Sequence, residues 1–221
     1  MTSYRIAKYG WREIGLGLLL ALVMAVPCAY ASPYLLFLPL LVIIFVLQFF
    51  RHPRYDLKYQ ENWLVAPAEG RIVTLEEVDE PVFIQGRAVK IGIFLSVFNA
   101  HINTSPVKGK VVFLQYNHGK FLNALYEESS RVNENNLIGI SRAAPNNGKV
   151  LVKQISGAIA RRIVPDVRLE QELCPGDLIG MIKFGSRTEV YVPVDAARPF
   201  EVNVRLKDKV YAGGTVLGEW K

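Results

Sequence analysis

The pair Gly185-Ser186 has the residue types that can cut their own peptide bond. It lies in Gly180-Met-Ile-Lys-Phe-Gly-Ser-Arg-Thr-Glu-Val-Tyr191, between two apolar, alternating stretches where a plain hairpin would favour Asn-Gly or Asp-Gly. For the serine hydroxyl to attack the carbonyl before it, the backbone must bend sharply, and glycine permits this because it has no Cβ. A bulged strand that happens to contain Gly-Ser is the alternative that the local sequence leaves open.

The attack would replace the amide by an ester, and elimination of that ester leaves dehydroalanine at a new N-terminus. Dehydroalanine hydrolyses to a pyruvoyl group and ammonia. A ketone carbonyl so placed condenses with a substrate amine and acts as an electron sink for loss of carbon dioxide. A Gly-Ser pair that reacted in this way would give the chain a prosthetic group of its own making, whereas the bulged strand would leave the pair intact.

Two further residues can assist such chemistry. His101 lies at a strand end that enters a polar turn, where a histidine can act as a general base near neutral pH. Glu69 lies between a proline and a glycine just before a strand, and such a carboxylate can orient a histidine as the third member of a triad. Taken alone, each local sequence also fits an ordinary surface turn.

Several familiar sites are absent from the sequence. The two cysteines, Cys28 and Cys174, lie far apart, so no disulfide framework is indicated. The three histidines are widely spread and no Cys/His cluster occurs, so no metal site is predicted. The chain also lacks the Gly-x-Ser-x-Gly nucleophile elbow, the Gly-rich phosphate loop and the His-Glu-x-x-His metal helix.

The elements that must position these residues lie in 55–221, which we interpret as one compact, β-rich α+β domain. Short runs of Val, Ile, Phe and Tyr recur there between Gly, Pro and Asn, a pattern typical of strands. The runs predict strands at 70–75, 88–95, 108–115, 149–155, 178–182, 188–192 and 200–206. Two short helices are expected, over roughly 121–131 and around 159–163.

Residues 1–54 predict a membrane anchor. No charged residue occurs from Ile14 to Phe50, and these 37 residues exceed the roughly 20 that cross a bilayer as a helix. Pro27 and Ala31-Ser-Pro33 interrupt the run, so we expect a hairpin of helices at about 14–30 and 34–50, which spans the membrane or dips into it. Basic residues outside both ends place both termini, and the following domain, on the cytoplasmic side of the cell membrane.

A cleaved secretory signal is the competing interpretation of this segment. Its start is basic, its core is apolar, and Ala29-Tyr-Ala31 resembles a cleavage site. The second apolar stretch weighs against it, because that stretch would stop transfer immediately.

The basic charge does not predict nucleic-acid binding. The net charge is +6, but residues 1–54 hold five basic residues against one glutamate, which leaves only +2 for the domain. Basic residues that flank a membrane segment suit anionic lipid headgroups instead.

Six sequence blocks, in order, resemble the short bacterial and archaeal type of phosphatidylserine decarboxylase over nearly the whole chain. One of them, Gln154-Ile-Ser-Gly-Ala-Ile-Ala-Arg-Arg-Ile163, is similar to a family pattern that begins Gln-Ile-Ala-Gly. The others are Phe49–Arg54, Ala66–Arg71, the string around His101, Tyr116–Ala124 with Asn133–Asn135, and the string around Ser186.

The resemblance implies a role for each site residue. Ser186 would be the self-cleavage nucleophile and, once converted, the pyruvoyl cofactor, with the cut between Gly185 and Ser186 leaving chains 1–185 and 186–221. His101 would be the base that assists cleavage, and Glu69 takes the place of a supporting aspartate. A second acid that is frequent two residues before the histidine is Asn99 here, so support for the base departs from the pattern at two positions.

The function that the resemblance implies is conversion of phosphatidylserine to phosphatidylethanolamine by a membrane-anchored, pyruvoyl-dependent decarboxylase, as a dimer. Arg161, Arg162 and Arg187 are candidates for holding the lipid phosphate, since guanidinium binds phosphate in a bidentate fashion. Three alternatives remain: an ether-linked archaetidylserine substrate, a relative that never matures, and a protease that uses Ser186 with Lys183. The last is disfavoured because residues three apart on a strand point to opposite faces.

Overall fold

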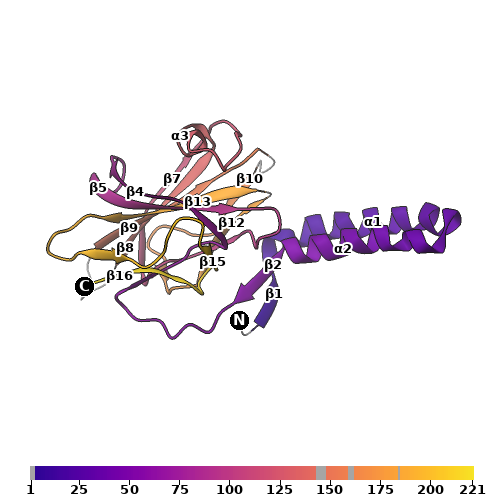
Figure 1. Ribbon diagram of the computed structural model, residues 1–221, viewed down its shortest axis with the longest axis horizontal. Coiled ribbons are helices and arrows are strands. Elements are labelled where there is room, and N and C mark those ends of the chain that lie inside the picture. Colours follow the sequence, from indigo (N-terminus) through magenta and orange to yellow (C-terminus); the bar gives the residue numbers. More distant parts are fainter. Residues whose placement is uncertain (1–2, 143–147, 159–161, 184) are drawn as a thin grey trace.

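The computed structural model describes residues 3–142, 148–158, 162–183 and 185–221. A long helical hairpin projects from one end of a β-rich body (Figure 1). The expectation of a mainly β, α+β chain with an N-terminal apolar hairpin is thereby confirmed.

The hairpin consists of apolar elements and closes on a small sheet at its base. Its parts are η1 (Lys8–Gly10), α1 (Trp11–Ala31), η2 (Pro33–Leu36) and α2 (Phe37–Phe49), flanked by the antiparallel pair β1 (Ser3–Ile6) and β2 (Arg51–Arg54). Pro27 lies inside α1 without ending it. The break falls at Ser32, whose φ of −168° and ψ of 134° are extended, because a residue before proline avoids the helical region.

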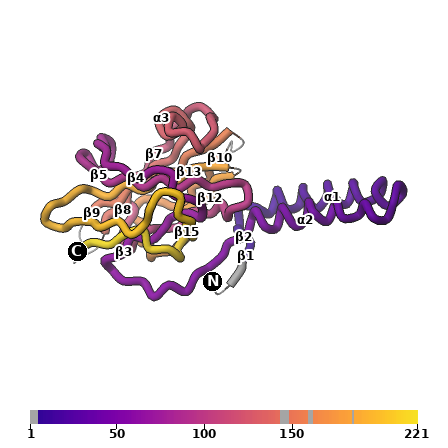
Figure 2. Tube along the Cα trace, viewed as in Figure 1, coloured from indigo at the N-terminus to yellow at the C-terminus, as the bar shows by residue number. Residues whose placement is uncertain are grey.

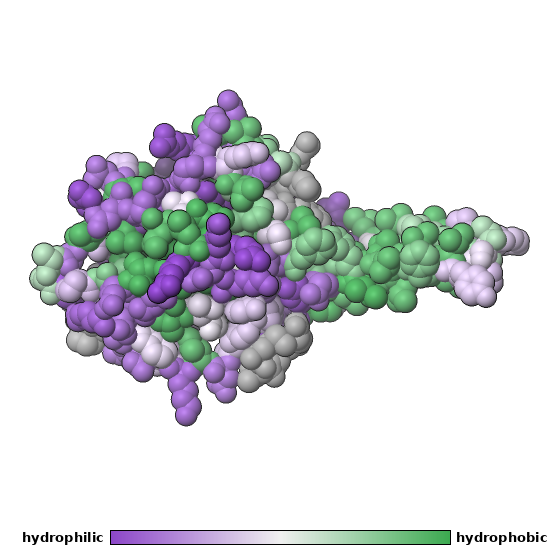
Figure 3. Space-filling model, viewed as in Figure 1, coloured by the Kyte–Doolittle hydropathy of each residue, from purple (hydrophilic) through white to green (hydrophobic). Residues whose placement is uncertain are grey.

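The surface of the hairpin is apolar along most of its length, whereas the visible face of the β domain mixes polar and apolar residues (Figure 3). The segment Lys8–Ala31 is long and apolar enough to cross a membrane, and little of it is buried inside the protein. The helix Pro33–Phe49 is apolar but shorter. After β2 the chain runs in an extended path along the edge of the domain to β3 (Figure 2).

The domain is built on an eight-stranded sheet in which every neighbouring pair is antiparallel. Its order is β11 (Glu172–Leu173), β7 (Gly109–Asn117), β8 (Asn135–Arg142), β9 (Gly148–Ile155), β13 (Ser186–Pro193), β5 (Gly86–Leu95), β4 (Gly70–Glu80) and β15 (Lys209–Val210). The strand β13 thus lies in the middle, between β9 and β5.

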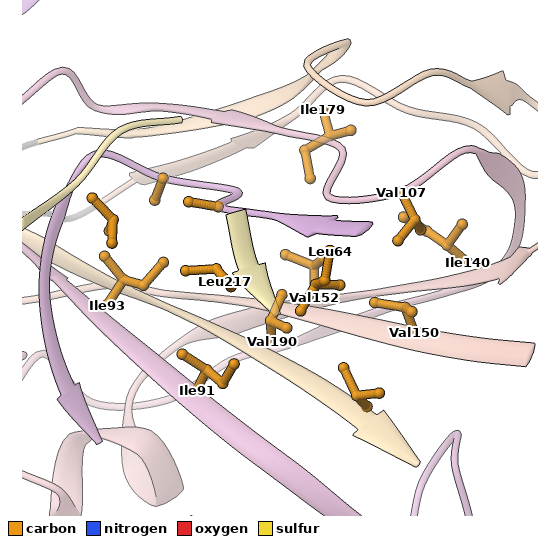
Figure 4. Close-up of a cluster of buried hydrophobic side chains, with 14 of the residues drawn as sticks. Leu64, Ile91, Ile93, Val107, Ile140, Val150, Val152, Ile179, Val190 and Leu217 are labelled. Atoms are coloured by element: carbon orange, nitrogen blue, oxygen red, sulfur yellow. The ribbon is translucent and has the colours of Figure 1, made fainter. Parts of the chain in front are cut away.

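Two three-stranded sheets complete the domain. One has the order β10 (Arg162–Pro165), β12 (Leu178–Lys183), β6 (Ile102–Thr104), and the other the order β14 (Phe200–Val202), β16 (Val216–Trp220), β3 (Trp63–Val65). Their side chains meet the inner face of the large sheet in one buried cluster, where Ile179 and Leu217 join Ile93, Val152 and Val190 (Figure 4). Burial of each such side chain contributes about 1.5–3 kcal/mol, so the small sheets are firmly held.

Both sequence-based helix predictions in the domain need correction. The helix expected at 121–131 is reduced to α3 (Glu128–Val132), because the side chain of Asn133 bonds both the N–H and the carbonyl of Leu122 and holds that stretch as a loop. The helix expected around 159–163 is wrong where it can be compared: Ile163 lies in β10, and 159–161 lie outside the described residues.

Candidate active site

The Gly185-Ser186 pair lies at the junction of β12 and β13. Gly185 has φ +65°, a left-handed conformation that strains any residue with a Cβ. Ser186 begins β13 and pairs with Leu95 of β5. Its side chain is fully buried, and in the described part of the chain its hydroxyl oxygen has no hydrogen-bond partner. A buried, uncommitted hydroxyl therefore adjoins a sharply bent peptide.

The carbonyl of Gly185 is packed against a second glycine, Gly157. A Cβ on Gly157 would lie 2.0 Å from that carbonyl oxygen and 3.0 Å from its carbon. Position 157 therefore has room only for glycine while the Gly185 carbonyl keeps this position. Sequence reasoning placed Gly157 in a family block but assigned it no role, because a close backbone approach leaves no signature beyond the glycine itself.

His101 lies on the N–H side of Gly185. Its Nε2 accepts a hydrogen bond from the N–H of Gly185 at 3.0 Å, and its Nδ1 donates to the carbonyl of Asn99 at 2.8 Å. These two bonds put the proton on Nδ1 and leave the Nε2 lone pair facing Gly185, the residue before Ser186. The carbonyl of His101 accepts from Ile182 N–H of β12 at 3.1 Å, which ties the histidine to the strand before the pair.

Burial holds the imidazole neutral. The side chain of His101 is fully buried, and this desolvation, together with the nearby Arg51 charge, lowers its pKa to about 4. The bond from Nδ1 to the carbonyl of Asn99 opposes this shift without cancelling it. Near neutral pH the imidazole is thus in the form that a general base requires.

Glu69 reaches His101 through an intermediary. Its Oε1 accepts from Arg51 Nη2 at 2.6 Å and from Asn99 Nδ2 at 3.1 Å, while His101 bonds the backbone of Asn99. The Asn99 side-chain oxygen in turn accepts from the N–H and hydroxyl of Ser96. Among the described contacts, Glu69 therefore does not bond His101 directly, as the third member of a triad would. It is connected to His101 through Asn99.

The base of the hairpin forms one wall of the site. The ring of Phe49 at the end of α2 stacks on the His101 imidazole with centroids 4.2 Å apart. Arg51 follows in β2 and also donates to the carbonyl of Phe98 at 3.1 Å. From α1, Glu13 accepts from the ammonium of Lys183 at 2.5 Å. Sequence reasoning placed Phe49 and Arg51 at the end of the anchor and in a family block but assigned neither residue a role.

The three arginines considered for phosphate binding differ in their exposure and in their charge partners. Arg187 is buried; its guanidinium pairs with Glu127 at 2.5 Å and Glu189 at 2.7 Å, and it donates to Thr74 at 2.7 Å. Because Arg187 directly follows Ser186 in β13, its side chain points to the opposite face of the sheet from Ser186. Its charge is paired with the two glutamates inside the protein. Arg162 is exposed on β10, and Arg161 lies outside the described residues.

Comparison with known proteins assigns the family. Residues 42–218 match the family described as phosphatidylserine decarboxylase. The chain is 42% identical over 211 residues to the phosphatidylserine decarboxylase proenzyme of Carboxydothermus hydrogenoformans, covering 96% of this chain and 94% of that protein. It is 40% identical to the proenzymes of Symbiobacterium thermophilum, covering 96% and 94%, and Rhodopirellula baltica, covering 99% and 90%. The chain belongs to the phosphatidylserine decarboxylase family.

The buried pair Arg51–Glu69 yields a stability prediction. Replacing Arg51 by Met leaves a buried carboxylate without its cation, so we expect a loss of about 3–5 kcal/mol in unfolding free energy. The matched control is Arg87→Met, whose pair with Glu77 is exposed and should cost at most about 1 kcal/mol. Denaturant unfolding in detergent, with Ser186→Ala in every sample, provides the measurement. Equal losses in the two variants would contradict the account of this pair.

Proposed function

We propose that this chain is a self-processing phosphatidylserine decarboxylase that converts phosphatidylserine to phosphatidylethanolamine with a pyruvoyl group made from Ser186. The observation that carries the proposal is the combination around Gly185: a buried, unpartnered Ser186 hydroxyl follows this left-handed glycine, whose N–H binds a neutral His101. Such a hydroxyl is free to become a nucleophile, and the imidazole next to it can take its proton.

In the proposed self-cleavage, Ser186 is the nucleophile and His101 is the base. As His101 Nε2 exchanges its bond to Gly185 N–H for the Ser186 hydroxyl proton, Oγ attacks the Gly185 carbonyl carbon. The C–N bond breaks, the amine takes up the proton, and an ester joins the two residues. Loss of the Ser186 α-proton then breaks the Cβ–O bond, releasing Gly185 as a carboxylate and leaving dehydroalanine. One water adds and one ammonia departs, which leaves the pyruvoyl group.

The new N-terminus would stay in the site after cleavage. Chain 186–221 contributes β13, held between β9 and β5, and also β14, β15 and β16. Its apolar side chains Val190, Val192 and Leu217 are fully buried in the common core. The two chains therefore remain one folded unit. The pyruvoyl group supplies an electrophilic carbonyl that takes up the substrate amine and accepts the electrons released with carbon dioxide.

The hairpin suits a lipid substrate. We propose that it inserts in the cytoplasmic membrane with the β domain on the cytoplasmic side, because basic residues flank its outer ends. The stacking of Phe49 on His101 then fixes the site at the foot of the membrane segment, near the headgroups. An enzyme so placed acts on its lipid without extracting the acyl chains from the bilayer.

Intact mass under denaturing conditions tests the proposal. We expect two chains, 1–185 and 186–221, the smaller blocked by a pyruvoyl group, and formation of phosphatidylethanolamine from phosphatidylserine vesicles. Ser186→Ala should remain a single chain without activity. A single full-length wild-type chain that leaves the vesicles unchanged would instead identify a relative that does not mature.

The close contact at Gly157 yields a second prediction. In Gly157→Ala the new Cβ must displace the Gly185 carbonyl, so we expect self-cleavage to slow at least about tenfold, an effect on the order of 1.4 kcal/mol in the barrier. Gly86→Ala is the control, since a Cβ there meets nothing within 4 Å. Cleavage is followed on gels after cell-free synthesis into nanodiscs. Cleavage of Gly157→Ala at the wild-type rate would refute the role of this contact.

The buried histidine predicts an unusual pH profile. Because the pKa of His101 is lowered to about 4, its basic form is already dominant well below neutrality, so the cleavage rate should be flat between pH 6 and 8. It should fall only as the pH drops through about 4, where the imidazole gains a proton. Time courses after a rapid pH shift of newly made precursor provide the measurement. A rate that follows a group with pKa near 6.5 would contradict this assignment.

A further inference from the structure

A buried polar network lies on the inner face of the large sheet, next to Ser186. Asn136 Nδ2 donates to Gln154 Oε1 at 2.9 Å, and Gln154 Nε2 donates to Asn103 Oδ1 at 2.8 Å. Asn103 Nδ2 then donates to the hydroxyl of Thr188 at 2.9 Å. These interactions link β8, β9, β6 and β13 and show which side chains of β9 and β13 share this face.

The register of β9 and β13 extends past the last paired residues. Gln154 lies opposite Thr188, and Ile155 lies opposite Arg187. One more step in this antiparallel register places Ser156 opposite Ser186.

The next step would place Gly157 opposite Gly185. The contact already described, where a Cβ on Gly157 would come 2.0 Å from the Gly185 carbonyl oxygen, agrees with that placement. The register therefore continues through the Gly185-Ser186 pair, even though regular strand pairing ends before it.

Side-chain alternation then brings the two serines together. Ser156 follows Gln154 by two residues, and Ser186 precedes Thr188 by two, so both serines point to the face of the polar network. Residues directly opposite each other on one face have Cβ atoms about 4.5–5.5 Å apart, within reach of a hydroxyl–hydroxyl hydrogen bond after rotation about χ1.

The state of the two hydroxyls supports the pairing. Both serines are fully buried, and in the part of the chain that the structure describes neither hydroxyl oxygen has a hydrogen-bond partner. The backbone of Ser156 is held firmly: its N–H donates to Glu134 at 3.0 Å and its carbonyl accepts from Asn133 Nδ2 at 2.8 Å. A buried hydroxyl without a partner is costly, which favours the bond between the two serines.

We propose that Ser156 is a positioning residue for self-cleavage: its hydroxyl hydrogen-bonds the Ser186 hydroxyl and directs it toward the Gly185 carbonyl while His101 takes the proton. This inference rests on the proposed function. The block Gln154-Ile-Ser-Gly157 resembles a pattern with alanine at this position, so Ser156 accelerates the step in this chain and is not required for it.

The test compares three variants made as full-length chains in nanodiscs. Ser156→Ala should slow self-cleavage about three- to tenfold, the effect of one uncharged hydrogen bond. Ser156→Thr keeps the hydroxyl and should restore most of the rate. Ser105→Ala is the control, because Ser105 is equally buried but its hydroxyl bonds the carbonyl of Val107 at 2.7 Å. That variant should cleave at the wild-type rate.

Melting temperature, measured with Ser186→Ala in every sample, separates positioning from a structural role. There Ser156→Ala removes a hydroxyl without a partner and should not lower Tm, whereas Ser105→Ala removes a formed bond and should lower it. Wild-type cleavage in Ser156→Ala, or a Tm loss larger than that of Ser105→Ala, would overturn the inference. A wild-type chain that never cleaves would instead refute the proposed function.

Discussion

Gly185 is held through both its N–H and its carbonyl, and the rest of the site is arranged around this constraint. Its N–H binds His101 Nε2 and its carbonyl oxygen lies against Gly157, so the bond before Ser186 has little freedom to move. The left-handed turn requires glycine at 185, and the close approach requires glycine at 157. The strands on either side, β12 and β13, fix this turn because each is paired within its sheet.

The apolar hairpin takes part in the same constraint. Phe49 covers the imidazole of His101, and Arg51 neutralises Glu69, which holds the side chain of Asn99. A segment that served only as a tether would need no such contacts. The packing explains how this polar cluster is buried at the base of an apolar hairpin, and why the histidine stays neutral there.

Much of the fold and part of the site could be predicted from the sequence. Apolar runs predicted the hairpin and seven of the sixteen strands in the described residues, five of them in the large sheet. The Gly-Ser pair marked the position where the structure places a left-handed glycine beside a buried hydroxyl. The strand β8 was missed because it begins with Asn135 and Asn136, whose buried side chains are satisfied by partners distant in sequence. The loop before α3 depends on Asn133 in the same way. The contacts at Gly157 and Arg51 arise only when separate segments meet, so no local pattern could reveal them.

The central claim is that the unreacted chain already holds His101 as a buried, neutral acceptor for the Gly185 amide. Nitrogen-15 NMR of histidine-labelled Ser186→Ala protein in detergent measures this directly, with a His101 variant for assignment of the signals. The account predicts that His101 is protonated on Nδ1 alone and does not titrate between pH 5.5 and 8. Titration of His101 near pH 6.5, or a proton on Nε2, would contradict it.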